Sequence, residues 1–199
     1  MEYKTNEPGD ELMVCQVKRE YNKEYYTFDD WLSLPEGFRS EVHDGVLVAM
    51  AEPTRKHQSI FGEIHGQLWQ FLKGKPCKVY AAPFGVRLSE KEDTGFEPDI
   101  IVVCDESKLE RRGICHGAPD MVVEILSPST KRIDKVYKFD KYLKAGVREY
   151  WIVDPELDIV QANVLQGGSY ITSMYNKESK APVSVLDGCA IDLADVFAE

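Results

Sequence analysis

Hydrophobic residues recur along this chain at spacings that alternate between those of helices and those of strands. Between His57 and Leu72 the apolar positions fall three or four residues apart, which is typical of an amphipathic helix. Two later runs, 97–103 and 119–126, are almost entirely apolar, as expected of strands buried on both faces of a sheet. Shorter patterns predict further strands at 149–153, 157–165 and 169–176, and one at 78–88 with an irregular middle at Pro83 and Gly85.

The first elements are defined by short-range signals. Thr27-Phe28-Asp29-Asp30 has the capping signature of a short helix, which should stop at Pro35-Glu36-Gly37. The stretch 39–48 turns at Asp44-Gly45 and predicts a β-hairpin, whose first strand carries Arg39, Glu41 and His43 on one face. Helices and strands interleave without strict β-α-β alternation. The pattern therefore predicts an α/β protein of mixed α+β type, with a mixed β-sheet flanked by helices.

Length and composition fit one soluble domain. The 199 residues are 43% hydrophobic, which is enough for one well-filled core. Residues 1–24 lack a clear period, so we expect a loose N-terminal arm followed by a single domain over 25–199. No run approaches the roughly 18 consecutive apolar residues of a membrane helix, and residues 1–10 are polar and acidic. We therefore expect a cytoplasmic protein that neither spans a membrane nor carries an export signal.

The five cysteines are scattered, with no Cys-x-x-Cys pair. This spacing argues against a zinc site and against a disulfide framework. Cys104 ends an apolar strand and Cys189 lies among small residues, so we expect buried free thiols.

Two carboxylates stand out because they interrupt the apolar runs. Asp99 follows Pro98 at the start of the first run, and Glu124 lies in the middle of the second. An acid in a buried strand must be neutralised, hydrogen-bonded or bound to a cation. Carboxylate oxygens are ligands that Mg²⁺ prefers, so the pair predicts a magnesium site for phosphodiester chemistry. Simpler alternatives are that Asp99 satisfies turn backbone and that Glu124 pairs with Arg148.

Charge limits the kind of nucleic-acid protein that the chain can be. The net charge of −10 argues against a protein that coats nucleic acid nonspecifically, because such binding needs many contacts from lysine and arginine to phosphate. Residues 130–145 are locally basic, with six lysines or arginines against two aspartates. This predicted helix is either a basic patch for a polyanion or an ordinary solvent-exposed helix face.

Five blocks of the sequence, between Tyr26 and Leu165, together resemble the Uma-two family of endonucleases, a branch of the PD-(D/E)xK superfamily. The blocks are Thr27-Phe28 with Leu34-Pro35, Glu41 with Asp44-Gly45, His57-Gln58, Glu97-Pro98-Asp99, and Glu124 with Leu126-Ser127-Pro128-Ser129-Thr130, Lys138, Tyr142, Gly146-Val147 and Glu149-Tyr150-Trp151. The resemblance implies a restriction-endonuclease-like fold, in which a mixed sheet lies between helices and the metal site lies on the central strands. The pair of strands after residue 157 would be an added antiparallel region.

The same resemblance implies roles for single residues. Asp99 and Glu124 match the family's metal-binding acids, Glu41 matches an additional carboxylate for the metal, and Lys138 matches the basic residue. The superfamily formula calls for a lysine two residues after Glu124, where this chain has Leu126. The resemblance implies that this lysine has moved to the following helix, at Lys138.

The helix of Lys138 leaves the choice of lysine open. On a helical wheel Lys138 points nearly opposite the predicted buried stripe, which consists of Ile133, Val136, Phe139 and Leu143. A site on that side would be shared with Asp134 and Tyr142, and Lys135 is the substitute candidate. Two further residues also have simpler explanations. Glu41 could pair with Arg39, and His57 could be a packed or capping histidine instead of a contact to substrate phosphate.

The residues and the resemblance together predict a Mg²⁺-dependent endonuclease, with Mn²⁺ as a substitute ion, that cuts DNA as a homodimer. Twofold assembly suits the cutting of two strands. The expected catalytic residues are Glu41, His57, Asp99, Glu124 and Lys138. One alternative is an inactive module of the same fold that binds nucleic acid or protein, and another is hydrolysis of RNA or of a different phosphodiester.

Overall fold

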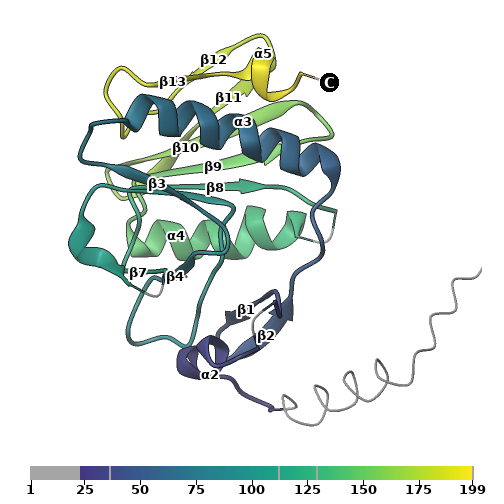
Figure 1. Cartoon of the computed structure of the whole chain (residues 1–199), viewed down its shortest axis with the longest axis vertical. Coiled ribbons are helices and arrows are strands. Elements are labelled where there is room, and N and C mark those ends of the chain that lie inside the picture. Colours follow the sequence, from purple (N-terminus) through teal and green to yellow (C-terminus); the bar gives the residue numbers. More distant parts are fainter. Residues whose placement is uncertain (1–22, 36, 112, 129, 199) are drawn as a thin grey trace, which may run out of the picture.

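The computed structural model describes residues 23–35, 37–111, 113–128 and 130–198, so nearly all of the predicted arm, 1–24, lies outside the described residues. Its centre is a six-stranded sheet with the order β11-β10-β9-β8-β5-β3 (Figure 1). The strands are β3 (Lys78–Ala81), β5 (Ile100–Val103), β8 (Met121–Ile125), β9 (Glu149–Asp154), β10 (Ile159–Gln166) and β11 (Ser169–Asn176). β8 and β9 run parallel, and the other neighbouring strands are antiparallel. The predicted mixed sheet is thus confirmed.

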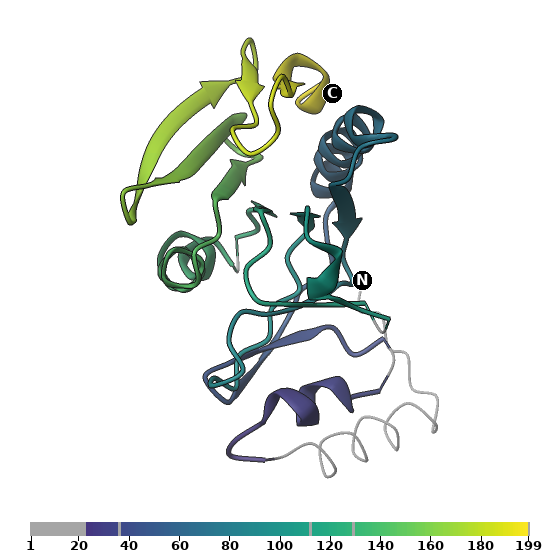
Figure 2. The same cartoon turned by 90° about the vertical axis from the view of Figure 1, so that its left-hand side faces the viewer.

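Helices cover both faces of this sheet, as Figure 1 and Figure 2 show. α3 (Arg55–Leu72), predicted from its apolar period, packs on one face together with the short α5 (Leu193–Val196). On the other face lie a π-helical turn, η2 (Ile133–Lys138), and α4 (Phe139–Ala145). Successive side chains of β5 alternate between the two cores, because Ile100 packs towards α3 and Ile101 towards α4. None of the described helices combines the length and apolar composition needed to cross a bilayer.

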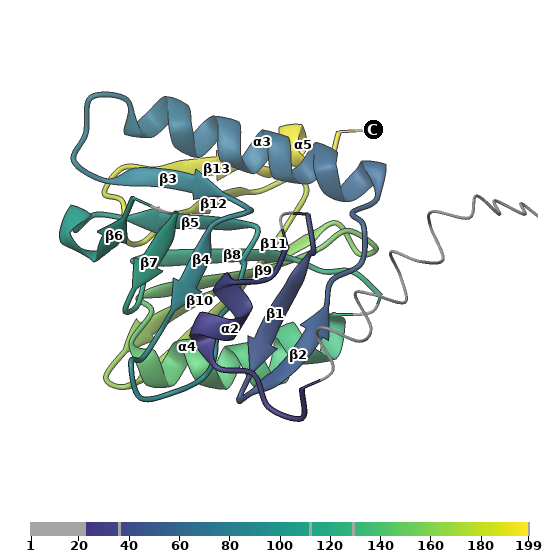
Figure 3. The ribbon, with the colours of Figure 1, turned by 60° about the horizontal axis from the view of Figure 1, so that its bottom comes forward.

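A small layer at the N-terminal side carries the first predicted elements. It consists of α2 (Phe28–Leu32) and the hairpin of β1 (Ser40–His43) and β2 (Val46–Ala49) (Figure 3). The predicted capping box is confirmed, because Thr27 and Asp30 exchange hydrogen bonds at the start of α2. This layer has its own apolar cluster, in which Phe28 and Trp31 pack against Val42. Val42 also forms a β-bridge with Gly95, and the apolar cluster includes Ile114, so the hairpin layer is tied to segments that follow α3.

The predicted strand 78–88 is two strands in different sheets. β3 ends at Ala81, and β4 (Gly85–Arg87) joins β6 (Leu109–Glu110) and β7 (Ile114–His116) in a three-stranded sheet. Pro83 lies between them and has no N–H with which to continue a ladder. A 3₁₀ turn, η1 (Glu106–Lys108), precedes β6, and β12 (Lys180–Pro182) pairs with β13 (Ala190–Asp192) before α5.

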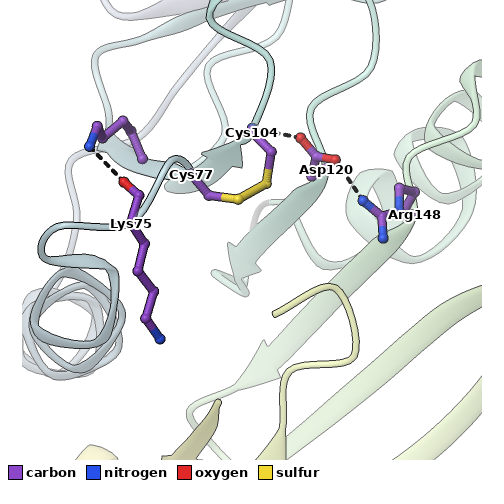
Figure 4. The surroundings of a disulfide bond; sticks show 6 residues. Lys75, Cys77, Cys104, Asp120 and Arg148 are labelled. Carbon is purple, nitrogen blue, oxygen red and sulfur yellow. Dashed lines mark hydrogen bonds and ion pairs between the residues drawn. A yellow bond between two sulfur atoms is a disulfide. The ribbon is translucent and has the colours of Figure 1, made fainter. Parts of the chain in front are cut away.

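The prediction that Cys104 is a free thiol is wrong. Cys77 and Cys104 form a disulfide, with their Cα atoms 3.8 Å apart (Figure 4). The pairing of β3 with β5 sets Lys78 opposite Val103. Continued by one residue, the same pairing sets Cys77 opposite Cys104. Figure 4 also shows Asp120, which accepts from the Cys104 amide at 2.8 Å and pairs with Arg148 at 2.9 Å. Cys115 and Cys189 are buried free thiols, as expected for Cys189.

Candidate active site

Asp99 and Glu124 lie on neighbouring strands at one end of the central sheet. Asp99 immediately precedes β5, and the register Ile100↔Val123, continued by one residue, sets it opposite Glu124 in β8. Opposite residues of an antiparallel pair point to the same face, here the face that α4 covers. Asp99 Oδ2 accepts from the Ile125 amide at 2.8 Å, so the two strands also fix the orientation of this carboxylate.

The hairpin contributes a third acid. Glu41 in β1 is buried, and its Oε1 lies 2.8 Å from Lys138 Nζ and accepts from the Glu97 amide at 3.0 Å. Its other oxygen, Oε2, is 2.8 Å from His43 Nε2, which the predicted alternation placed on the same strand face. Arg39, the simpler partner considered for Glu41, instead donates to the carbonyl of Ala51.

Lys138 is the lysine that reaches the acids. Its Nζ is 2.8 Å from Glu41 and 2.9 Å from Glu124, and the side chain is only 4% exposed. Lys135 points elsewhere and pairs with Asp154 at 3.6 Å. Arg148, the alternative partner for Glu124, pairs with Asp120.

The predicted buried stripe of this helix is wrong at Val136, which is 64% exposed. Residues 133–138 form a π-helical turn, which an ideal wheel does not represent. Asp134, Lys138 and Tyr142, spaced by four, are the residues of this helix that lie buried against the sheet. The predicted shared side of the helix is thus where the acids lie.

Asp134 and Tyr142, which were expected to share the site with Lys138, do contact its residues, whereas the contact of His43 was not predicted. Tyr142 donates its hydroxyl to Glu124 Oε1 at 3.0 Å, and Asp134 Oδ1 lies 3.5 Å from Lys138 Nζ. His43 holds Glu41 and was not assigned a role. The spacing of four from Asp134 through Lys138 to Tyr142, and the spacing of two from Glu41 to His43, were the available signals.

His57 lies at the first turn of α3, where Thr54 caps its amide. Its Nε2 is 3.2 Å from Asp99 Oδ2, so the structure brings it to the same acid that the strands orient. His57 therefore belongs to a helix start and also faces the acids, and its contact to substrate phosphate stays a prediction. Its Nδ1 is buried and has no hydrogen-bond partner among the described residues.

Burial and a shared cation set the electrostatics of the cluster. Burial, with Asp134, Asp99 and Glu41 nearby, raises the pKa of Glu124 well above its usual value despite Lys138. Burial would also raise the pKa of Glu41, but Lys138 and His43 lower it to about 2. The surrounding carboxylates outweigh burial and raise the pKa of Lys138 well above its usual value. One ammonium thus faces more carboxyl groups than it can neutralise, and Glu124 is the one that most readily keeps a proton.

Six residues of this cluster lie in the wall of one cavity of about 410 Å³, namely Glu41, His57, Asp99, Glu124, Asp134 and Lys138. The cavity is also lined by the β2 end, by the 125–128 segment and by Asp154. Lysines of the basic helix are largely paired with acids, since Lys131 contacts Asp154 and Glu156, and Lys141 contacts Asp44 and Glu92. The predicted basic patch is therefore mostly neutralised by the protein's own carboxylates.

The donor set fits a hard divalent cation bound by few protein ligands. Among the residues that the structure describes, no three His, Cys, Asp or Glu side chains are arranged to hold a metal by themselves. Mg²⁺ usually keeps several waters and is bound through one or two carboxylates plus substrate phosphate. Asp99 and Glu124 each have one oxygen, Oδ1 and Oε2, that makes no hydrogen bond within the described part of the chain.

A mixed sheet between helices, with acids and a lysine at one end of its central strands, defines an α+β protein with a polar site at the end of its sheet. A crystal structure from Anabaena variabilis ATCC 29413, of a protein called a "putative nuclease belonging to DUF820", has this fold. It matches with a TM-score of 0.71 at 24% identity and covers 87% of this chain and 98% of that one.

The sequence comparison then identifies the family. The Uma2 family model, described as "Putative restriction endonuclease", matches residues 24–194, and the chain belongs to this family. The chain is also similar to an uncharacterized protein of Synechocystis sp. (strain ATCC 27184 / PCC 6803 / Kazusa). The two are 26% identical over 130 residues, which are 63% of this chain and 67% of that protein.

Proposed function

We propose that this protein is a Mg²⁺-dependent endonuclease, with Mn²⁺ as a substitute ion, that hydrolyses phosphodiester bonds in DNA. The observation that carries the proposal is the convergence of Glu41, Asp99, Glu124 and Lys138 on one cavity, although they come from four separate segments. Membership in a family described as restriction endonucleases supports the reaction class.

In this proposal each residue has a separate task. Asp99 and Glu124 would hold the ion through their free oxygens, with Glu41 as an additional carboxylate. A bound Mg²⁺ supplies a more acidic water and offsets charge on the phosphate. Lys138 places a positive charge where negative charge develops on the phosphate oxygens. His57 would contact substrate phosphate from the edge of the cavity.

The experiment that tests the proposal is a nicking assay on supercoiled DNA with purified full-length protein. We expect nicking with Mg²⁺ or Mn²⁺, none with EDTA, and a loss of at least about 100-fold in Asp99→Asn and Glu124→Gln, the scale of losing a main electrostatic group. Asp140→Asn is the matched control, because Asp140 pairs with Lys144 on the exposed face of α4. Nicking that survives in both site variants, or that needs no metal, would contradict the proposal.

Oligomeric state, polymer and location belong to the same proposal. A homodimer would present two sites to the two strands of a duplex, and sedimentation of the protein with and without duplex DNA measures this. Parallel assays with single-stranded DNA and RNA separate the polymers. The proposed location is the cytoplasm.

One observation favours a second candidate, an inactive module that binds nucleic acid or protein. Lys138 already forms ion pairs with Glu41 and Glu124, so the cation position between these acids is filled by the protein itself. Binding of DNA without any cleavage, together with no heat of Mn²⁺ binding by calorimetry, would favour this module over the nuclease.

A further inference from the structure

A second cavity, of about 390 Å³, lies beside the first and is not used by the proposed chemistry. The two cavities have wall residues in common, namely Arg39, Pro53, His57 and Asp99. Asp99 and His57 are therefore a partition between them. Whatever occupies the second cavity lies next to Asp99, which the proposed function assigns to the metal, and His57, which it assigns to the substrate phosphate.

The walls of the second cavity combine aromatic rings with unused polar groups. Phe38, just before β1, is 38% exposed, and Phe61 of α3 is half-buried; both line the cavity. The exposed Gln58 amide and the half-buried Glu97 carboxylate line it too. Neither of these two side chains hydrogen-bonds with another described residue, although Glu97 lies close enough to Glu41 and Arg39 to feel their charges.

We propose that the second cavity binds the base of the nucleotide whose phosphodiester lies at Asp99; this rests on the proposed function. An aromatic ring such as Phe38 offers a stacking surface to any base. The Glu97 carboxylate accepts a hydrogen bond from an exocyclic amino group, and the Gln58 amide can pair with an adenine edge. The cavity therefore selects bases that carry an exocyclic amino group, namely adenine, cytosine and guanine, over thymine.

The shared wall explains why base and phosphate can be held together. The base and phosphate of one nucleotide are joined through a single sugar, so they must occupy adjoining spaces. A base in this cavity cannot remain stacked in a duplex, so the proposal implies an unstacked nucleotide or a single-stranded segment at the cut.

Calorimetry on the full chain with nucleotide probes is the first test. We expect dAMP or dCMP to bind about 5- to 150-fold more tightly than deoxyribose 5-phosphate, the range that base–aromatic stacking provides. Phe38→Ala should remove this excess, and Gln58→Ala should reduce it. The matched control for Phe38→Ala is Trp69→Ala, at an exposed aromatic residue, and the control for Gln58→Ala is Gln70→Ala, at an exposed glutamine of the same helix α3. Neither residue lines either cavity, so both control variants should leave the excess unchanged.

Sequencing of the ends cut from a random DNA library is the second test. Glu97→Gln should change the base preferred beside the cut, because the carboxamide can donate where the carboxylate only accepts. If wild-type protein cuts DNA but the monophosphates bind no more tightly than the sugar phosphate, the base site is wrong and the nuclease proposal stands. If base-dependent binding is lost in Phe38→Ala yet no condition gives cleavage, the base site stands and the nuclease proposal fails.

Discussion

The most consequential single residue is Lys138, because it is a buried cation among carboxyl groups. It lies 2.8 Å from Glu41, 2.9 Å from Glu124 and 3.5 Å from Asp134. A buried pair contributes little net stability when compared with an apolar replacement of both partners, but removing one partner leaves the other charge unpaired. Lys138 therefore ties the stability of the fold to the acids of the site.

We expect Lys138→Met to lower the free energy of unfolding by about 3–5 kcal/mol at pH 7.5, because buried carboxylates lose their cation. Lys135→Met is the matched control and should change it by less than about 1 kcal/mol, since Lys135 is partly exposed. Urea unfolding followed by circular dichroism gives both values. Equal losses in the two variants would contradict the assignment of Lys138 to the site.

The same variant pair should show a defined pH dependence. In the wild type Glu41 has a pKa of about 2 instead of 4.5, so its stabilising effect is present above pH 4.5 and is lost as the pH falls towards 2. The gap between wild type and Lys138→Met should therefore be largest above pH 5 and shrink in acid. A gap that stays constant down to the lowest pH at which the protein folds would argue against this charge pairing.

The sequence could reveal the acids but not every contact between them. Asp99 and Glu124 were recognisable because burying a carboxylate within an apolar strand costs free energy. An acid inside an apolar run can be seen in the sequence itself. The wheel placed Lys138 opposite the apolar stripe, but its burial depends on docking against Glu41 and Glu124, which come from other segments. The roles of His43 and Asp134 depend on how the hairpin and the helix dock, which is a tertiary property.

At the scale of elements, local sequence signals predicted the helices and strands well, but they did not predict which strands lie next to one another. The capping box at Thr27, the period of α3 and the turn at Asp44-Gly45 all produced the predicted elements, because each depends on residues that are close in sequence. The split of 78–88 and the Cys77–Cys104 bond were not predicted. Both depend on which strand lies next to β3, and sheet order is set by the packing of the whole chain.

The disulfide should stabilise the edge of the central sheet. It joins residues 27 positions apart, and the chain-entropy relation gives about 3.5 kcal/mol for a loop of this size. We expect Cys77→Ser with Cys104→Ser to lower the free energy of unfolding by about that amount. Reductant should destabilise the wild type to the same level and leave the double variant unchanged. A wild type that does not respond to reductant would show that the bond is absent in solution.

The three-stranded sheet carries a pH-sensitive histidine. His116 on β7 lies 2.9 Å from Glu90 and 3.1 Å from Glu110, and these hydrogen bonds raise its pKa. Its stabilising effect is therefore present below the ordinary pKa of 6.5 and is lost as the pH rises through the raised value.

We expect His116→Gln to cost less than about 1 kcal/mol near pH 6, because the site is partly exposed, and still less at alkaline pH. Thermal unfolding measured across this range reports the difference. His65→Gln is the control, and its effect on stability should have the opposite pH dependence, because burial lowers the pKa of His65. Parallel pH profiles for the two variants would contradict the assignment.

At the scale of the whole molecule, the site is assembled from parts with different cores. Glu41 comes from the hairpin layer with its own apolar cluster, Asp99 and Glu124 from the main sheet, and Lys138 from the helical layer beside α4. Tyr137 and Lys141 bind Asp44 at the hairpin turn, so the helix also holds the hairpin in place. The cavity therefore forms only when all three parts have docked.

The position of Lys138 also means that the protein itself supplies a positive charge for the buried carboxylates. Proteins whose ligands are held together by zinc unfold when a chelator removes the ion. Here we expect EDTA to leave the melting temperature of the purified protein unchanged, whereas Mg²⁺ at about 100 times its dissociation constant should add about 2.7 kcal/mol. A fall in melting temperature with EDTA would contradict this. If the melting temperature does not respond to EDTA, folding does not depend on the supply of divalent ions. The divalent-ion concentration could then control the proposed cleavage without unfolding the protein.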